Sequence, residues 1–313
     1  MNQPKTKREL AEAGLKPVKH AGQNFLISEE IIGKIISAAK IKKGETILEA
    51  GPGTGNLTEA LLSAGAKVIA VEKDRNLSQM LISNFQFPIS NKKLKVLNED
   101  ILGFNETTIK KSYRIIANIP YYLTGQLIQK FLLSRNKPME MILMVQKEVG
   151  ERITAKPPKM NYLAALVQSA AKTEILFGVS KDNFWPKPKV DSVVIKLIPV
   201  PATPDPHTAS MRSHARCMFK IKDNKDSKDK DNKDKNNIDK NNTEFIEFLR
   251  MVFKQPRQTL FNNLRGGGVK NAGEIIDQLD LPKNVRGQNL NIKQLQALSK
   301  SLLNSKNQIP NPK

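Results

Sequence analysis

The segment Gly51-Pro52-Gly53-Thr54-Gly55 constrains the fold of this chain more than any other. It follows a short apolar run at 46–50 and precedes the run 56–65, whose apolar residues have helical spacing. Glycine accepts positive φ and lets the backbone approach a ligand closely. A strand, a glycine turn and a helix in this order predict the ligand-binding start of an α/β fold.

Short apolar runs and helical runs continue to alternate after this turn. We expect further strands within 67–74, 94–100, 114–120, 139–149 and 190–200, with helices between most of them. The segment 162–179 is expected to begin as a helix and end as a strand. This alternation predicts a parallel sheet with helices on both faces. The segment 184–189 (FWPKPK) is expected to be an extended loop because of its prolines.

The composition changes near residue 200. Prolines recur without apolar periodicity over 199–210, which indicates a linker, and helical spacing returns beyond it. We therefore expect one domain over 1–200 and a small helical domain over 201–313. Residues 220–242 contain eight Lys and six Asp and little to bury, so a disordered low-complexity insertion is expected there.

The net charge of the chain indicates which kinds of partner it can bind. The chain carries 51 Lys+Arg against 30 Asp+Glu, a formal net charge of +21, which favours nucleic acid first and an anionic membrane surface second. No run of eighteen apolar residues occurs, and the first ten residues resemble no secretory signal. Cys217 is the single cysteine, and the three histidines are scattered. We expect a cytoplasmic protein without a metal, a disulfide or a membrane span.

The spacing of the glycines favours one class of cofactor. A dinucleotide fold uses G-x-G-x-x-G, whereas this loop reads G-x-G-x-G, a form typical of S-adenosylmethionine sites. Glu72 ends the next strand about twenty residues on, where an acid holds ribose hydroxyls. Asp100 ends the third strand and can accept from an adenine amino group. A lone glycine turn is often only a turn, and a nicotinamide oxidoreductase is the alternative that this spacing and charge disfavour.

Asn118-Ile119-Pro120-Tyr121 (NIPY) ends the following strand. With it, the chain resembles the ribosomal RNA adenine dimethyltransferase family over nearly its whole length. The resemblance rests on GQNFL, EAGPGTGNLT, VIAVEKD, NED, NIPY, QKEVGERITAKP and FWPKPKVDSVVIKL, in family order. It implies a class I S-adenosylmethionine-dependent methyltransferase with a Rossmann-like, seven-stranded sheet and an all-helical C-terminal domain.

The resemblance also implies roles for individual residues. Cofactor contacts are expected from Asn24, Leu26, Gly51, Glu72, Asp100 and Asn118. Gln23 and His20 are weaker candidates, and Ile101 either packs on the cofactor adenine or is plain core. The catalytic group is expected to comprise Asn118, Pro120, Tyr121 and Phe184.

The residue chemistry of NIPY suits methylation of an adenine amine, whose lone pair is delocalised into the ring. Hydrogen bonds from both N–H groups to the Asn118 side-chain oxygen and to a backbone carbonyl near Ile119-Pro120 would localise that lone pair. Tyr121 would stack on one face of a flipped base and Phe184 on the other. Core packing is the alternative for both rings, and Tyr122 is evenly balanced between the two roles. Positioning for in-line displacement needs no general base.

Two branches of the family remain open. One dimethylates two adjacent adenosines in a 3′-terminal hairpin of 16S rRNA within the immature 30S subunit. The other dimethylates one adenine of 23S rRNA and confers macrolide resistance. Segments 253–264 and 286–298 resemble the first branch, although Pro256-Arg257 stands where two adjacent basic residues are common.

We expect the 16S enzyme, acting as a monomer, and keep a non-catalytic RNA-binding assembly factor as a further alternative. Basic residues are expected to meet phosphate, and the candidates are Arg152, Lys187, Lys189, Arg250, Lys254, Arg257 and Arg265.

Overall fold

The computed structural model describes residues 5–17, 22–200 and 244–304. Contacts between Cα atoms divide the chain into two compact units. The first comprises Met1–Gly150 with Lys172–Pro199, and the second comprises Glu151–Ala171 with Val200–Lys313. The domain limits expected from the sequence, 1–200 and 201–313, remain a prediction, and the expected insertion at 220–242 lies outside the described residues.

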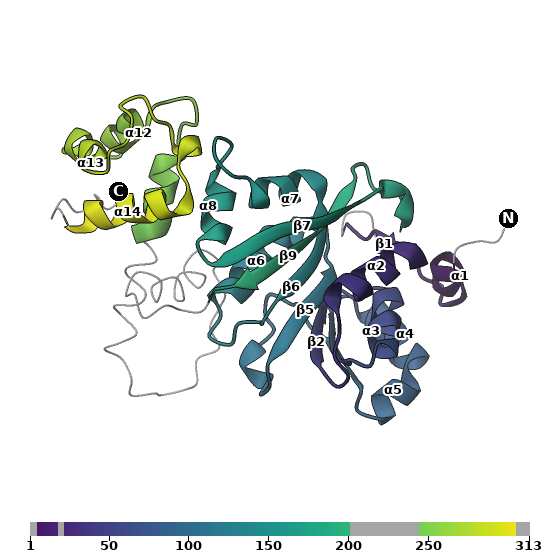
Figure 1. Ribbon diagram of the computed structural model, residues 1–313. Coiled ribbons are helices and arrows are strands. Elements are labelled where there is room, and N and C mark those ends of the chain that lie inside the picture. The colour runs from purple at the N-terminus through teal and green to yellow at the C-terminus, as the bar shows by residue number, and fades with distance from the viewer. Residues whose placement is uncertain (1–4, 18–21, 201–243, 305–313) are drawn as a thin grey trace. The chain divides into compact units, whose positions relative to one another are not determined.

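A seven-stranded sheet forms the centre of the first unit, in the order β4-β3-β2-β5-β6-β9-β7 (Figure 1). Its strands are β2 (Thr46–Ala50), β3 (Lys67–Glu72), β4 (Leu94–Asn98), β5 (Tyr113–Asn118), β6 (Met141–Gln146), β7 (Ala171–Val179) and β9 (Ser192–Pro199). The seven-stranded α/β fold is confirmed. The expectation of a parallel sheet is correct from β4 to β6, but β9 runs antiparallel to β6. Apolar runs carry no information on strand direction, so the sequence could not show this.

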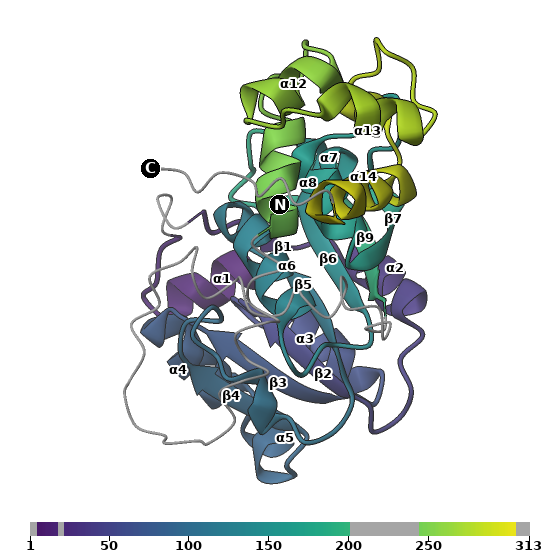
Figure 2. The same cartoon turned by 90° about the vertical axis from the view of Figure 1, so that its left-hand side faces the viewer.

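Helices alternate with these strands in the first unit. They are α1 (Lys5–Glu12), α2 (Glu29–Ala39), α3 (Asn56–Ser63), α4 (Arg75–Asn84), α5 (Gln86–Ser90), α6 (Thr124–Leu133) and the start of α7 (Lys147–Thr154). Figure 2 shows α4 and α5 beside β3 and β4 at one edge of the sheet. None of the described helices is long and apolar enough to cross a membrane.

Local sequence signals explain where several helices begin. Ser28 caps α2, its Oγ accepting from Ile31 N at 3.4 Å, and Asp74 caps α4 by accepting from the two N–H groups of Asn76 and Leu77. Such caps satisfy N–H groups that the helix itself leaves unpaired. Because Asp74 lies two residues after the end of β3, the same cap that starts α4 also fixes the chain where this central strand ends.

A two-stranded ladder departs from the predicted loop at 184–189. β8 (Phe184–Trp185) pairs antiparallel with β1 (Phe25–Leu26), with Leu26 opposite Phe184. The first two residues of FWPKPK are therefore strand, and only the residues after them are loop. This ladder brings the N-terminal segment against the late part of the first unit.

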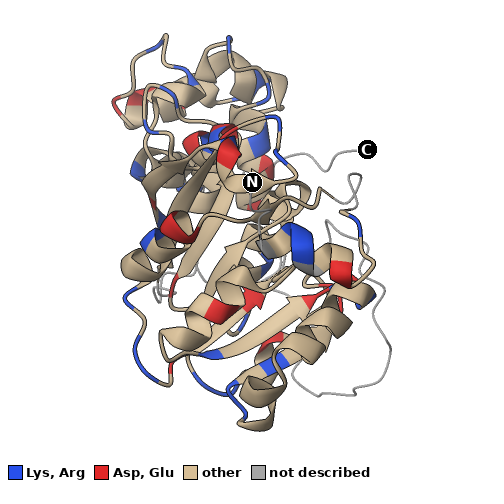
Figure 3. Cartoon of the chain, turned by 90° about the vertical axis from the view of Figure 1, so that its right-hand side faces the viewer, with Lys and Arg blue, Asp and Glu red and all other residues tan. Residues whose placement is uncertain are grey.

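The described part of the second unit is helical apart from its loops. It contains α8 (Tyr162–Gln168), a helix over 244–252, α12 (Leu260–Gly266), α13 (Ala272–Gln278) and α14 (Ile292–Asn304). Buried Asn263 closes the loop before α12, because its amide both accepts from Gln255 N at 3.2 Å and donates to Gln255 O at 3.1 Å. Lys and Arg occur along both units, with acidic residues interspersed (Figure 3).

Candidate active site

A cavity of about 640 Å³ lies at the carboxyl ends of β2, β3 and β5. Its size is in the range of cofactor pockets. Eight of the nine predicted site residues line it: Asn24, Leu26, Gly51, Glu72, Asp100, Asn118, Pro120 and Tyr121. The structure thus brings together residues from separate segments, as expected for the edge of a sheet where strand order reverses.

The glycine loop forms one wall of the cavity through its backbone. Gly51 has φ +67° and Gly53 has φ +61°, values that favour glycine. A Cβ on Gly53 would lie 2.9 Å from the Phe25 ring, and one on Gly51 would lie 3.5 Å from Pro120 Cδ. The loop after β2 therefore packs closely against both β1 and the NIPY turn.

Glu72 is held at the end of β3 by two backbone donors. Its Oε2 accepts from Gly53 N at 3.1 Å and its Oε1 accepts from Asp74 N at 2.9 Å. The residue is 7% exposed, and burial raises the pKa of its carboxyl group. A carboxylate oriented in this way can accept from the hydroxyl groups of a ribose.

Asp100 begins the turn after β4. Its Oδ1 accepts from Leu102 N at 2.9 Å, and its Oδ2 lies 2.9 Å from Lys73 Nζ. Burial opposes ionisation of Asp100, but the Leu102 N–H and the Lys73 ammonium hold its pKa below the ordinary value. Ile101 is 5% exposed and lines the cavity beside it, which fits both of the roles considered for it.

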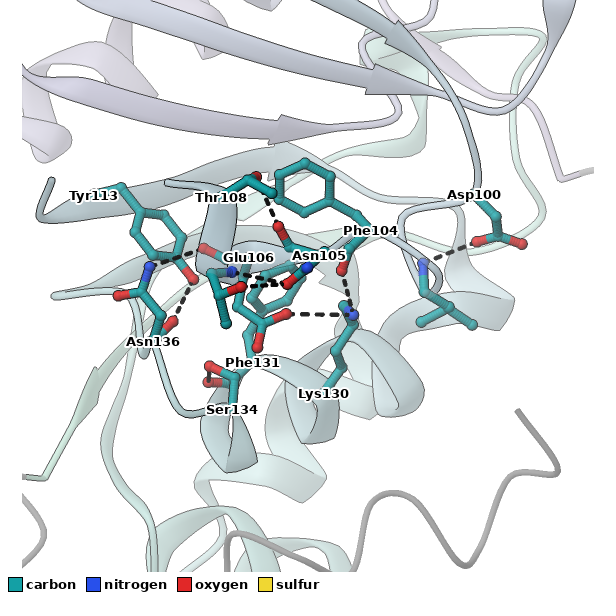
Figure 4. A network of polar contacts seen from close by, with 12 residues as sticks. Asp100, Phe104, Asn105, Glu106, Thr108, Tyr113, Lys130, Phe131, Ser134 and Asn136 are labelled. Atoms are coloured by element: carbon teal, nitrogen blue, oxygen red, sulfur yellow. Dashed lines mark hydrogen bonds and ion pairs between the residues drawn. The ribbon is translucent and has the colours of Figure 1, made fainter. Parts of the chain in front are cut away.

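A polar network fastens this turn to α6 (Figure 4). Lys130 Nζ on α6 donates to Phe104 O at 2.7 Å and lies 3.7 Å from Glu106 Oε2. Asn136 Nδ2 donates to the carbonyl groups of Glu106 and Ile109 at 2.8 and 2.9 Å. Since α6 follows the NIPY turn directly, the network links the Asp100 side of the cavity to the Asn118 side.

The NIPY turn presents one amide and one ring to the cavity. Asn118 Nδ2 donates to Asn24 O at 3.2 Å, and Asn24 Nδ2 donates in turn to Gly22 O at 3.1 Å. The Tyr121 hydroxyl lies 2.9 Å from Oγ of buried Ser192, and burial raises the pKa of that hydroxyl. Both side chains are therefore held by the protein itself.

Phe184 is the predicted site residue that does not line the cavity. It is 3% exposed and belongs to the buried core cluster that also contains Leu26 and Ile31. Its pairing with Leu26 in the β1–β8 ladder brings it into that cluster. The ring thus takes the core position that was its alternative, and stacking on a base would require it to leave the core.

Two of the weaker candidates have different outcomes. Gln23 lines the cavity, and its Nε2 donates to Asp74 Oδ2 at 3.3 Å. His20 lies outside the described residues. Trp185, the neighbour of Phe184, packs against the cluster formed by Leu10, Phe25, Leu77 and Met80.

Glu49 is a cavity residue that the sequence interpretation did not select. It is 1% exposed, and burial raises the pKa of its carboxyl group to about 8, against the opposing effect of a 2.6 Å hydrogen bond from Thr58 Oγ1. Its sequence signal is an acid two residues before Gly51, inside a mostly apolar strand. Lys73 and Tyr122 also line the cavity, and Lys73 is recognisable as the residue after Glu72.

Lys187 and Arg265, two of the candidate phosphate contacts, each lie beside another side chain. Lys187 forms an ion pair with Asp182, and both side chains are more than half exposed. The Arg265 guanidinium lies 5.7 Å from the centre of the Phe261 ring in the second unit. Within the described ranges, no group of three or more His, Cys, Asp or Glu side chains is arranged to hold a metal ion.

Comparison with known proteins gives a family match and several similar chains. The profile of the family "Ribosomal RNA adenine dimethylase" matches residues 15–220. The ribosomal RNA small subunit methyltransferase A of Clostridioides difficile is 33% identical, with 96% of each chain covered, and that of Lactobacillus acidophilus is 32% identical, with 95% of each covered.

Solved structures give the same result for the fold. A dimethyladenosine transferase from Plasmodium falciparum superposes with a TM-score of 0.68 and is 25% identical, covering 88% of this chain and 96% of its own. The 23S rRNA methyltransferase ErmE has a TM-score of 0.64 at 18% identity, covering 89% of this chain and 99% of its own. At that identity, the second likeness shows the fold alone.

Proposed function

The chain belongs to the ribosomal RNA adenine dimethylase family, and we propose that it is an enzyme that dimethylates N6 of two adjacent adenosines in a 3′-terminal hairpin of 16S rRNA. The observation that carries the proposal is the cavity that gathers the glycine loop, Glu72, Asp100 and the NIPY turn. The curated relatives cited above are small-subunit methyltransferases by name, which favours 16S over 23S rRNA as the substrate.

The residues present fit S-adenosylmethionine, which supplies the electrophilic methyl group when bound. Glu72 offers oriented carboxylate oxygens for ribose hydroxyls, and Asp100 offers an acceptor for the adenine amine. Gly51 and Gly53 leave room where a side chain would meet Pro120 or Phe25. Leu26 and Asn24 complete the proposed cofactor contacts on the side of the N-terminal segment.

Asn118 is the proposed acceptor for the first N–H of the target amine. Because its Nδ2 donates to Asn24 O, its Oδ1 is the atom available to accept. The Pro120 carbonyl already accepts from Leu123 N at 2.9 Å, and the Tyr121 carbonyl accepts from Thr124 Oγ1 at 3.0 Å. The Ile119 carbonyl is therefore the proposed second acceptor, with Pro120 restricting the backbone beside it.

Tyr121 is the proposed stacking surface for the flipped adenine. Its hydroxyl contact with Ser192 fixes the ring before the base arrives, so little freedom is lost on binding. The chain needs no general base for this chemistry. It must hold the amine in line with the methyl group and exclude water around it.

The proposed partner is 16S rRNA within the immature 30S subunit, bound by a monomer in the cytoplasm. The helical second unit is the proposed RNA-holding part, with Arg250, Lys254, Arg257 and Arg265 among its basic residues. Phosphate contacts of this kind position an enzyme without reading sequence. Their number would appear in the salt dependence of RNA affinity.

Tritiated methyl transfer from S-adenosylmethionine tests the proposal. Unmethylated 30S particles and protein-free 23S RNA are offered in parallel, and labelled nucleosides are identified after digestion. Dimethyladenosine from the 30S particles alone is the expected result. Label in the 23S RNA alone would assign the chain to the resistance branch.

Cofactor binding without label in either RNA would favour the assembly-factor alternative. An Asn118→Ala variant sharpens this point. If the protein is an enzyme, the variant loses methyl transfer while still binding 30S particles. If it is only an assembly factor, the variant and the wild type support assembly equally.

A further inference from the structure

Tyr122 is an aromatic residue at the cavity that no step above uses. It is the second residue of the 3₁₀ turn Tyr121–Leu123 and is 59% exposed. The large hydrophobic side chains exposed within the described residues include Ile82, Phe87 and Met139, but of the whole set Tyr122 is the one that lines the cavity. A half-exposed aromatic ring that lines a cavity can contact a ligand bound there.

The turn separates the two neighbouring tyrosines. The Tyr121 hydroxyl is bonded to buried Ser192, whereas the Tyr122 hydroxyl makes no hydrogen bond within the described residues. The Tyr122 ring instead lies beside Gly22, where an added Cβ would be 3.6 Å from Cδ1 and 3.9 Å from Cε1. The glycine backbone thus supports one edge of the ring, while more than half of the side chain stays open to solvent.

A cation lies at the same part of the cavity. Lys73 is 68% exposed and pairs with Asp100 at 2.9 Å. That hydrogen bond and the charge of Asp100 raise the pKa of Lys73, and the Tyr122 hydroxyl acts in the same direction. An aromatic ring with a nearby cation is the combination by which proteins hold unpaired nucleotides.

We propose that Tyr122 is a stacking platform for the unpaired RNA base next to the adenine held at Asn118. The inference rests on the proposed function. Flipping one adenine into the cavity removes the stacking partner of its neighbour. Tyr122 follows Tyr121 directly in the chain, so its ring can take that neighbour while Tyr121 takes the target. The platform is sequence-tolerant, because every base has an aromatic face.

The proposal has one competing role, a cover over the cofactor. Both roles use a ring at the cavity, but they act on different ligands. A platform for RNA affects the KM for particles and leaves cofactor affinity unchanged. A cover affects the Kd for S-adenosylmethionine whether RNA is present or not.

Three variants of the full-length protein separate these roles. Tyr122→Ala removes the ring, and Tyr122→Phe keeps the ring without the hydroxyl. Phe87→Ala is the matched control, since Phe87 is 74% exposed on α5 and does not line the cavity. Each is assayed for Kd of S-adenosylmethionine by calorimetry, and for KM and kcat with unmethylated 30S particles.

We expect Tyr122→Ala to raise the KM for particles about 10-fold, the usual effect of losing one stacked base. Its Kd for S-adenosylmethionine should stay within about twofold of wild type, which also shows that the variant is folded. Tyr122→Phe and Phe87→Ala should match wild type in all three quantities.

An unchanged KM in Tyr122→Ala would overturn the inference, and so would a parallel rise in the cofactor Kd. Wild-type protein that binds S-adenosylmethionine but labels no particles would instead overturn the proposed function. The two failures are therefore distinguishable in one series of measurements.

Discussion

The buried and partly buried carboxyl groups at the two ends of the central sheet have different partners. At the amino end, the Arg114 guanidinium contacts Glu45 Oε2 at 3.2 Å, Glu140 Oε1 at 2.5 Å and the Ala39 carbonyl at 2.7 Å, and Lys196 lies 3.3 Å from Glu140. At the carboxyl end, the hydrogen bonds recorded for Glu49 and Glu72 come from neutral donors, namely a hydroxyl and backbone N–H groups.

We interpret the charged groups at the amino end as structural and the carboxyl groups at the carboxyl end as available to a ligand. The amino end neutralises its ions within the chain, so nothing is left for a ligand to complete. At the carboxyl end, Lys73 pairs with the more exposed Asp100, but Glu49 and Glu72 are oriented by neutral donors, and burial raises the pKa values of both glutamates. Perturbed carboxyl groups in a cavity are typical of functional sites. The following experiments test this contrast, from the largest expected effect to the smallest.

Asn118→Ala should reduce kcat about 10³-fold, because it removes a fixed acceptor that acts on the amine in the transition state. The Kd for S-adenosylmethionine should rise far less than kcat falls. Single-turnover methyl transfer to unmethylated 30S particles measures the effect. Asn84→Ala, at the exposed end of α4, is the control, and equal losses in both variants would contradict the assigned role.

Arg114→Met should lower the free energy of unfolding by about 3 kcal/mol, since it removes the cation that pairs with partly buried Glu45 and leaves Glu140 with Lys196 alone. Urea unfolding measures this loss. Cofactor affinity at low temperature should be unchanged, because the site is at the other end of the strands. Arg75→Met, at an exposed position, should shift the free energy of unfolding by no more than about 0.5 kcal/mol. A comparable loss in both variants would show that the Arg114 ion pairs are not what stabilises the amino end of the sheet.

Glu49→Gln should change the pH dependence of stability. The folded protein keeps the Glu49 proton up to about pH 8, whereas the ordinary pKa of 4.5 applies to the unfolded chain. The stability contributed by this group therefore falls as pH rises from about 4.5 to about 8 and is constant above that.

The glutamine variant cannot ionise, so its stability relative to wild type should rise by about 2.5 kcal/mol between pH 5 and pH 7. Urea unfolding of both proteins at four pH values measures the difference between their free energies of unfolding. The other titrating groups are the same in both proteins, so their contributions cancel in this difference. Parallel stability curves would show that Glu49 does not hold a proton in the folded state.

Glu72→Gln should weaken S-adenosylmethionine binding about 20-fold. The amide cannot accept from both Gly53 N and Asp74 N and also present a charged acceptor to a ribose. Calorimetry gives the Kd directly. Glu29→Gln, which removes an exposed carboxylate from the first turn of α2, is the control and should bind as wild type does.

The sequence could predict this site because its parts are local. Gly51, Glu72, Asp100 and Asn118 each lie at the end of a strand or within two residues after it. Apolar spacing reveals these strands, and parallel strands bring their carboxyl ends to one edge. The spacing of the strands does not predict the burial or the hydrogen-bond partners of each side chain. Glu49 lies within an apolar run, and its burial beside Thr58 has no sequence signal of its own.

Longer-range pairing explains the remaining differences. The β1–β8 ladder joins segments about 160 residues apart in the chain, and it carries Phe184 into the core. The direction of β9 likewise depends on its pairing with β6 and not on its own residues. Neither contact leaves a periodic signal, so both required the structure.

The hydrogen bond from Asn118 to Asn24 has a consequence for recognition. An amide group has two orientations of nearly equal shape, related by a half-turn, and only one of them offers oxygen to a substrate amine. In this chain the choice is made by a backbone carbonyl 94 residues earlier in the sequence. Turning the amide would set two oxygens face to face. If the N-terminal segment took another path, the Asn118 amide could turn and offer a donor in place of an acceptor to the substrate amine. No residue of NIPY would need to change.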